Sequence, residues 1–180
     1  MTSADPISAS PAAPQRRGFG IDVGGSGIKG GIVDLDTGQL IGDRVKLLTP
    51  QPATPKAVAK TIADVVREFD WTGPLGVTYP GVVTHGIVRT AANVDKSWIG
   101  LNAADLISAQ LNGQPVTVLN DADAAGLAEE RYGAGRDATG EGWLCALAVV
   151  ASAALGRAAI PPGPPLKLVR LLPLFTTVWL

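Results

Sequence analysis

The feature that most constrains this chain is a run of glycines near its N-terminus. Residues 19–31, FGIDVGGSGIKGG, hold six glycines together with Asp22 and Lys29. Glycine inside a strand or helix costs about 0.5–1 kcal/mol relative to alanine, so such a cluster indicates either a tight turn or a ligand that approaches the backbone closely. Apolar residues flank the central glycines, which predicts two strands joined by a short turn.

A third apolar run, QLIGDRVKLL at residues 39–48, follows a second turn at Thr37 and Gly38. Three strands separated by short glycine-bearing turns are typical of consecutive antiparallel hairpins. The glycine run therefore lies between two strands and does not open a helix. This position and the glycine spacing argue against the Rossmann and P-loop motifs, both of which lead into a helix.

A phosphate chain is the ligand that such a turn would suit. Three glycines are expected to adopt positive φ and to point their backbone N–H groups inward, namely Gly24, Gly25 and Gly27. Ser26 would add a hydroxyl, Lys29 a cation, and Asp22 a carboxylate that faces a hydrated Mg²⁺. The alternative is a glycine-rich hairpin turn that binds nothing.

The segment TPKAVAKTIADVVREF, residues 54–69, has helical periodicity. Thr54 predicts an N-cap, and Pro55 suits the first helical position because its missing N–H is not needed there. The apolar stripe of this helix comprises Val58, Ile62, Val65, Val66 and Phe69. Further along, we expect strand-like runs at 75–81 and 82–90, a helix over 103–111, a strand over 116–119 and a helix ending near Gly133. This order of elements predicts an α/β fold.

An acidic turn, LNDADAAG at residues 119–126, follows the last of these strands. Open α/β sheets tend to bind ligands at the carboxyl ends of their strands. Asp121 is therefore either the N-cap of the following helix or a general base that removes a proton from a bound sugar, with Asn120 beside it.

A second polar segment, NVDKSWIG at residues 93–100, suits a polyhydroxylated ligand. Asn93 and Asp95 would bind its hydroxyl groups, and Trp98 would supply an apolar wall. The equally simple alternative is a solvated loop with an anchoring tryptophan. His85 has no Cys or His partner in its neighbourhood of the sequence, so we expect a surface histidine.

Composition excludes several classes of partner. The net charge of −1 results from 15 basic and 16 acidic residues, so nothing indicates binding to nucleic acid or to a membrane surface. The single cysteine, Cys145, rules out an internal disulfide framework and favours a reducing, cytoplasmic location. The apolar run at 143–155 is too short for a membrane span.

Taken together, the segments DVGGSGIKGG, YPG, ANVDKSW and LNDADAA resemble the ROK sugar kinases of the actin, hexokinase and Hsp70 superfamily, and most of all their polyphosphate-using branch. The resemblance implies an actin-like ATPase (ribonuclease H-like) fold, a cytoplasmic enzyme, and often a homodimer. It implies that polyphosphate or ATP, with Mg²⁺, donates a phosphoryl group to the 6-hydroxyl of glucose. The resemblance makes Asp121 the base and lets Asn93, Asn120 and Asp121 contact glucose. The implied phosphate site comprises Asp22, Gly24, Gly25, Ser26, Gly27 and Lys29, with Asp22 also facing Mg²⁺ through water.

The resemblance also divides the chain. We expect a disordered tail at 1–17, an N-terminal lobe with the phosphate hairpin at 18–115, the start of a C-terminal lobe at 116–136, and an aberrant segment at 137–180. That last segment has no acidic residue after Glu141 and lacks the second phosphate loop of the family. Both features are expected of a segment translated in a shifted reading frame. We therefore expect impaired catalysis.

Two other functions fit these residues less well. A sugar-sensing ROK regulator would need a helix-turn-helix domain ahead of the glycine run, and 1–17 is too short for one. An actin-like or Hsp70-like ATPase module would share the hairpin but not the sugar-site segments.

Overall fold

The first three strands form two consecutive antiparallel hairpins, as the sequence predicts. A computed structural model of the chain describes residues 16–132. The strands are β1 (Arg17–Val23), β2 (Gly27–Asp34) and β3 (Leu40–Leu48). In this register Asp22 lies opposite Lys29. The sheet begins at Arg17, one residue before the expected start of the lobe, and residues 1–15 of the expected tail lie outside the described residues.

Helix α1 (Pro55–Arg67) follows the predicted cap. The hydroxyl oxygen of Thr54 accepts a hydrogen bond of 3.4 Å from the backbone N–H of Ala57. Four of the predicted stripe residues are buried, namely Val58, Ile62, Val65 and Val66. Phe69 lies beyond the helix, where its ring packs edge-on against Phe19 at a centroid distance of 5.0 Å. The stripe therefore faces the sheet and continues past the end of the helix.

Two parallel strands complete the main sheet. Strand β4 (Leu75–Tyr79) pairs with β1, and β7 (Val116–Asn120) pairs with β4, giving the order β3-β2-β1-β4-β7. The expected run at 82–90 is a separate hairpin of β5 (Val83–Thr84) and β6 (Ile87–Val88). His85 and Gly86 form its turn with φ of 51° and 77°, and His85 is exposed as expected. The remaining elements are η1 (Lys96–Trp98), α2 (Ala103–Gln110) and α3 (Asp121–Tyr132).

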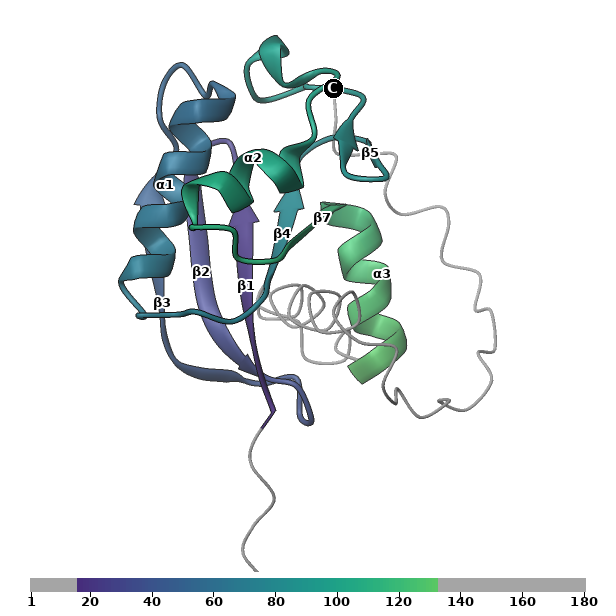
Figure 1. The fold of residues 1–180 in the computed structure, drawn as a ribbon. Coiled ribbons are helices and arrows are strands. Elements are labelled where there is room, and N and C mark those ends of the chain that lie inside the picture. Colours follow the sequence, from purple (N-terminus) through teal and green to yellow (C-terminus); the bar gives the residue numbers. More distant parts are fainter. Residues whose placement is uncertain (1–15, 133–180) are drawn as a thin grey trace, which may run out of the picture.

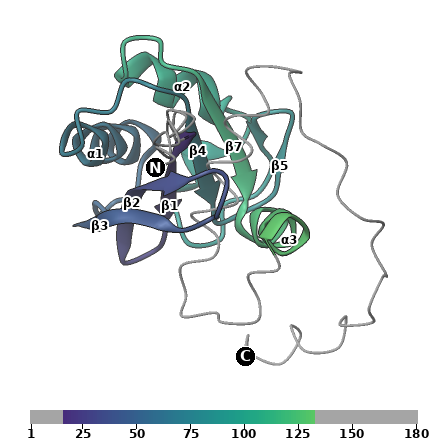
Figure 2. The same ribbon diagram turned by 90° about the horizontal axis from the view of Figure 1, so that it is seen from below.

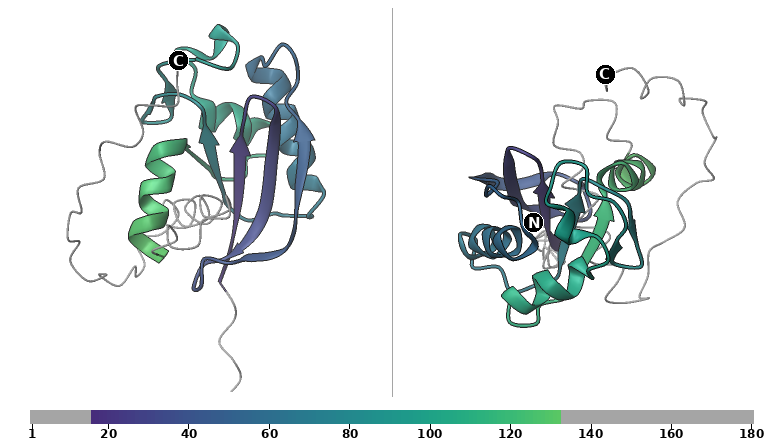
Figure 3. Two further views of the ribbon diagram at one scale, coloured as in Figure 1. Left: turned by 180° about the vertical axis from the view of Figure 1, so that it is seen from behind. Right: turned by 90° about the horizontal axis from the view of Figure 1, so that it is seen from above.

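The sheet is covered on both faces. Helices α1 and α2 lie together on one face, and α3 lies on the other (Figures 1 and 2). Neighbouring residues of β7 contribute to opposite faces of the sheet. Val118 belongs to the core under α1 and α2, whereas Leu119 packs against Ala124 and Ala128 of α3. Views from behind and from above show the same division (Figure 3).

Strand β7 corrects one detail of the expected division. It was expected to start a second lobe at residue 116, but it is hydrogen-bonded to β4 in the same sheet from Val116 to Asn120. The sheet therefore continues through Asn120 with no break at 115. The expected segment 137–180 lies outside the described residues. No helix in the described range is long and apolar enough to cross a bilayer.

Candidate active site

Three parallel strands end side by side and bring polar residues from distant parts of the sequence together. Asp22 of β1 lies opposite Thr78 of β4, and Tyr79 of β4 lies opposite Asn120 of β7. Asp121 comes directly after Asn120, as the first residue of α3. The carboxyl edge of the sheet is the place where α/β folds commonly bind ligands, so these residues define the candidate site.

Asp22 is the buried carboxylate of this site. Only 5% of the residue is exposed. One carboxylate oxygen accepts a hydrogen bond of 3.0 Å from the hydroxyl of Thr78, and the other lies 3.5 Å from the ammonium nitrogen of Lys29. Burial raises the pKa of Asp22, the bonds to Thr78 and Lys29 oppose that shift, and the negative charge of Asp121 adds to it. The last effect places the two carboxylates within electrostatic reach of each other.

The glycine turn has a different conformation from the expected nest. None of Gly24, Gly25 and Gly27 has φ in the left-handed region, so the expectation of positive φ was wrong. The backbone N–H of Gly24 donates to the carbonyl oxygen of Gly27 at 3.0 Å, so it closes the hairpin and is not directed at a ligand. Gly25 and the side chain of Ser26 remain exposed at the tip.

Space, not φ, selects glycine at the base of this turn. A Cβ on Gly27 would lie 2.4 Å from Cε of Lys46 and 3.3 Å from the carbonyl oxygen of Leu47. A Cβ on Gly24 would lie 3.0 Å from the carbonyl oxygen of Gly27. A side chain at Gly27 would displace the Lys46 side chain, and backbone carbonyl oxygens leave little room for a Cβ at either Gly24 or Gly27.

The loop that contains Asn93 reaches the hairpin tip. A Cβ on Gly25 would lie 3.9 Å from Cβ of Asn93, which is ordinary van der Waals contact. Asn93 itself is exposed. The candidate phosphate turn and the candidate sugar-binding residue are therefore neighbours.

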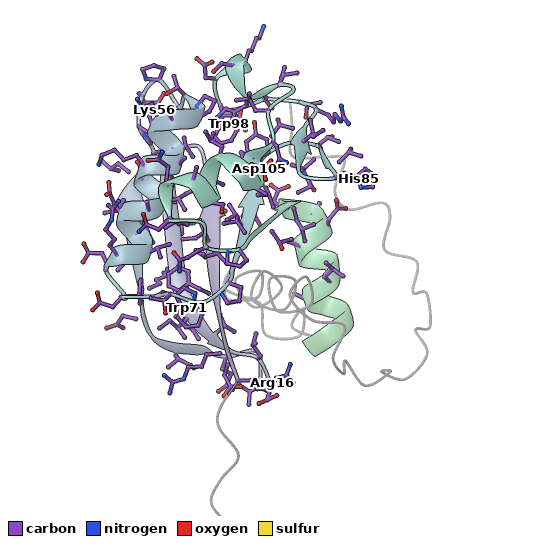
Figure 4. The ribbon with its side chains drawn as sticks, in the orientation of Figure 1. Arg16, Lys56, Trp71, His85, Trp98 and Asp105 are labelled. Carbon is purple, nitrogen blue, oxygen red and sulfur yellow. The ribbon has the colours of Figure 1, made fainter. Side chains whose placement is uncertain are left out.

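The other two residues of that loop are structural. Asp95 accepts hydrogen bonds from the backbone N–H of Ser97 at 2.8 Å and from its hydroxyl at 2.5 Å, and these bonds lower the pKa of Asp95. Trp98 is 1% exposed, and its indole N–H donates to the carbonyl oxygen of Ala53 at 3.0 Å. Its ring packs on that of Tyr79. Figure 4 shows where Trp98 lies, near the end of α1 that carries Lys56. Trp98 therefore anchors the loop, and the expectation of an apolar wall for the ligand was wrong.

Asn120, not Asp121, caps α3. The side-chain oxygen of Asn120 accepts from the backbone N–H groups of Ala122 at 2.8 Å and Asp123 at 3.3 Å. Its amide nitrogen donates to the carbonyl oxygen of Gly81 at 3.0 Å, which ties β7 to the turn after β4. Asp121 is left exposed, with one oxygen 2.9 Å from the N–H of Ala122. The structure thus gives Asn120 a structural role and leaves the carboxylate of Asp121 facing solvent.

Two functional neighbours escape sequence reasoning. Thr78 orients Asp22, and its only signal is a polar residue near the end of an apolar strand. Thr49 donates to the carbonyl oxygen of Gly24 at 2.6 Å. No local pattern marks Thr49, because its partner is 25 residues away.

The donor set suits magnesium only in a hydrated form. Within residues 16–132, no three side chains of His, Cys, Asp and Glu come together as a metal cluster. Asp22 offers hard oxygen atoms that already accept bonds from Thr78 and Lys29. Mg²⁺ commonly keeps several waters and binds one or two carboxylates plus substrate phosphates, so Asp22 fits as a ligand through water.

Known proteins share both the sequence and the arrangement. The chain is 78% identical over 142 residues to a polyphosphate glucokinase of Mycobacterium tuberculosis, covering 78% of this chain and 54% of that protein. It is 74% identical over 135 residues to a polyphosphate glucokinase of Mycobacterium leprae, covering 75% and 42%. The chain spans about half the length of the curated relatives it matches.

Solved structures of two sugar kinases resemble the described fold. A polyphosphate/ATP-glucomannokinase from Arthrobacter sp. strain KM is 54% identical with a TM-score of 0.63, covering 69% of this chain and 51% of that one. A ROK glucokinase from Streptomyces griseus, in complex with glucose and AMPPNP, is 31% identical with a TM-score of 0.57, covering 68% and 38%.

The sheet order, the two helical layers and the polar carboxyl edge define a part of an actin-like ATPase fold, the fold of the ROK sugar kinases. Residues 18–140 match the model of the ROK family. The chain belongs to the ROK family.

Proposed function

We propose that this chain binds glucose and a phosphoryl donor, polyphosphate or ATP, and that its site serves phosphoryl transfer to the 6-hydroxyl of glucose. The observation that carries the proposal is that a buried carboxylate, Asp22 of β1, and an exposed one, Asp121 directly after β7, lie on the same carboxyl edge of the sheet, with the glycine hairpin directly after β1. The named activities of the mycobacterial and Arthrobacter relatives support it.

Asp121 is the base in this proposal. Its carboxylate is exposed and lies at the start of a capped helix, so it is fixed in position yet open to an acceptor hydroxyl. A positioned general base of this kind contributes about 10²–10⁴-fold to a rate. Asn93, across the hairpin tip, contacts the sugar, and Asn120 holds Asp121 in place as well as lying within the sugar site.

The hairpin and the buried pair serve the donor. Gly25 and Ser26 face the phosphate chain at the exposed tip, and Gly24 and Gly27 keep the tip in shape. Lys29 offsets phosphate charge beside Asp22. A magnesium ion held through water at Asp22 would neutralise further negative charge on the donor. Catalysis of this type depends mainly on positioning and electrostatics.

The matched residues supply only part of a kinase site. The described residues hold the hairpin and the proposed base, and the chain spans about half the length of its curated relatives. We propose that these 180 residues turn over slowly. We place the activity in the cytoplasm. Glucose binding without turnover, as in a sugar-binding regulatory protein, is the second candidate function.

Two aspartates on one helix provide the test. Asp121 and Asp123 are both exposed in the first turn of α3. In Asp121→Asn, we expect glucose phosphorylation with polyphosphate or ATP to fall by about 10²–10⁴-fold while circular dichroism stays unchanged. In Asp123→Asn, we expect both activity and fold to be retained.

Calorimetric titration with glucose separates the candidates. Glucose binding with turnover supports the kinase, and binding without turnover supports the regulatory protein. Absence of glucose binding to the 180-residue chain, or equal losses in Asp121→Asn and Asp123→Asn, would overturn the proposal.

A further inference from the structure

A short segment between β3 and α1 contacts both halves of the candidate site. This connecting segment comprises residues 49–53. At one end, the hydroxyl of Thr49 donates to the carbonyl oxygen of Gly24 at 2.6 Å. Thr49 is only 7% exposed, so little water competes for that bond. The segment thus holds the glycine hairpin at its base.

At the other end, Ala53 holds the loop that contains Asn93. Its carbonyl oxygen accepts two hydrogen bonds, from the indole N–H of Trp98 at 3.0 Å and from the backbone N–H of Asp95 at 3.3 Å. Trp98 packs on Tyr79 with ring centroids 5.2 Å apart, and both side chains are buried. The loop therefore follows the position of Ala53.

The segment itself is restrained. The backbone N–H of Thr54 donates to the carbonyl oxygen of Pro52 at 2.8 Å, and Thr54 caps α1, which is packed on the sheet. Ala53 is 5% exposed. Only three residues separate Thr49 from Ala53, so the backbone offers a short route by which a displacement at Thr49 could reach Ala53.

We propose that the connecting segment couples the two ligand sites: occupancy of the hairpin by a phosphate chain orders the Asn93 loop for the sugar, with Thr49 as the positioning residue. This rests on the proposed function, because it assigns the donor to the hairpin and the sugar to the loop. Coupling between two binding sites is reciprocal and commonly amounts to about 5–150-fold in affinity.

The binding test compares glucose affinity with and without tripolyphosphate. In the wild-type chain, tripolyphosphate is expected to tighten glucose binding by a factor in the range of about 5–150. In Thr49→Val, which keeps the shape but removes the hydroxyl, that factor falls toward 1. Thr49→Ser restores the factor.

A matched control is available on α1. The hydroxyl of Thr61 donates to the carbonyl oxygen of Ala57 at 3.0 Å, away from the site, so Thr61→Val loses a comparable bond and should keep the coupling. A Thr49→Val variant that retains the full coupling factor, or a wild-type chain that binds both ligands independently, overturns the proposal.

Hydrogen exchange tests the segment without any ligand. We expect Thr49→Val, but not Thr61→Val, to speed exchange of the Asp95 amide and the Trp98 indole N–H, because both donate to Ala53. Unchanged exchange overturns the proposed connection even if glucose binds. A third outcome separates the two proposals. If the wild-type chain binds neither ligand but exchange is faster in Thr49→Val, the proposed function is refuted, while the connection between Thr49 and the Asn93 loop is supported.

Discussion

Thr78 donates a hydrogen bond of 3.0 Å to the carboxylate of Asp22, although 56 residues separate the two in the sequence. Thr78 is fully buried, and the second oxygen of Asp22 faces Lys29. A carboxylate bound on both oxygens has a fixed orientation. The parallel pairing of β1 and β4 therefore builds a rigid, charged floor for the candidate site.

Asp22→Asn should raise the stability of the chain at neutral pH and weaken its binding of tripolyphosphate. Burial raises the pKa of Asp22 above its ordinary value of 3.8, so the folded state binds the proton more tightly than the unfolded state. The free energy of unfolding therefore decreases as pH rises from 3.8 through the native pKa, and it stays lower above that window. Asparagine cannot ionise, so we expect the variant to be more stable than the wild type at neutral pH, with the difference vanishing below the window.

Denaturant titrations at neutral pH and at about pH 3 check this difference. Binding of tripolyphosphate should weaken in the same variant, since the orientation of Lys29 depends on the carboxylate. A variant that is less stable at neutral pH would show that the bonds to Thr78 and Lys29 outweigh the cost of burying the charge.

Tyr79→Phe should stabilise the chain. Among the residues that the structure describes, the buried hydroxyl of Tyr79 has no hydrogen-bond partner, and burial raises the pKa of Tyr79. An unsatisfied buried polar group costs about 1–3 kcal/mol, so its removal should raise the free energy of unfolding by about 1 kcal/mol. Thermal unfolding measures the change. Trp98→Phe, which removes the bond to Ala53, should do the opposite, and a destabilised Tyr79→Phe would reveal a partner for the hydroxyl.

Gly30→Ala should destabilise the sheet. A Cβ at this position would lie 2.6 Å from Cγ1 of Val65 and 2.7 Å from Cδ1 of Ile21, so α1 would have to move away from the sheet. Overpacking of this kind costs about 1–3 kcal/mol. The control is Gly126→Ala in α3, where nothing lies within 4 Å of the added atom. There we expect a gain of about 0.5–1 kcal/mol from helix propensity, and equal effects of the two substitutions would contradict the packing argument.

Gly25→Ala should leave the fold intact and weaken donor binding. The added Cβ would be in ordinary contact with Asn93 at 3.9 Å, and Gly25 has no left-handed φ to strain. The melting temperature should therefore change little, while the new methyl group occupies the tip that the proposed phosphate chain approaches. Titration with tripolyphosphate provides the measurement. Unchanged affinity would place the phosphate chain elsewhere.

The elements that the sequence predicted correctly are those set by local chemistry. The cap at Thr54, the proline at position 55 and the apolar stripe together determine α1. The antiparallel pairing of the first strands follows from short turns between apolar runs.

The details that the sequence missed depend on tertiary contacts. Trp98 in a polar loop is compatible with either a ligand wall or an anchor, and only the position of Ala53 decides between them. The glycines of the hairpin predicted positive φ, but what the structure shows at Gly24 and Gly27 is little room for a Cβ beside backbone carbonyl oxygens. Asn120 and Asp121 are both acceptable caps, and the register of β7 selects Asn120.

The place of β7 at one end of the sheet order has a consequence for biosynthesis. A chain that leaves the ribosome from its N-terminus exposes Asp22 and Lys29 long before Asp121 is made, and β7 joins the sheet only once Asn120 can bond to Gly81, 39 residues back. Any nascent chain that ends before residue 121 lacks the carboxylate of Asp121. A small molecule that touches both of them would bind only finished sheets, and by mass action it would protect newly made chains from unfolding and proteolysis.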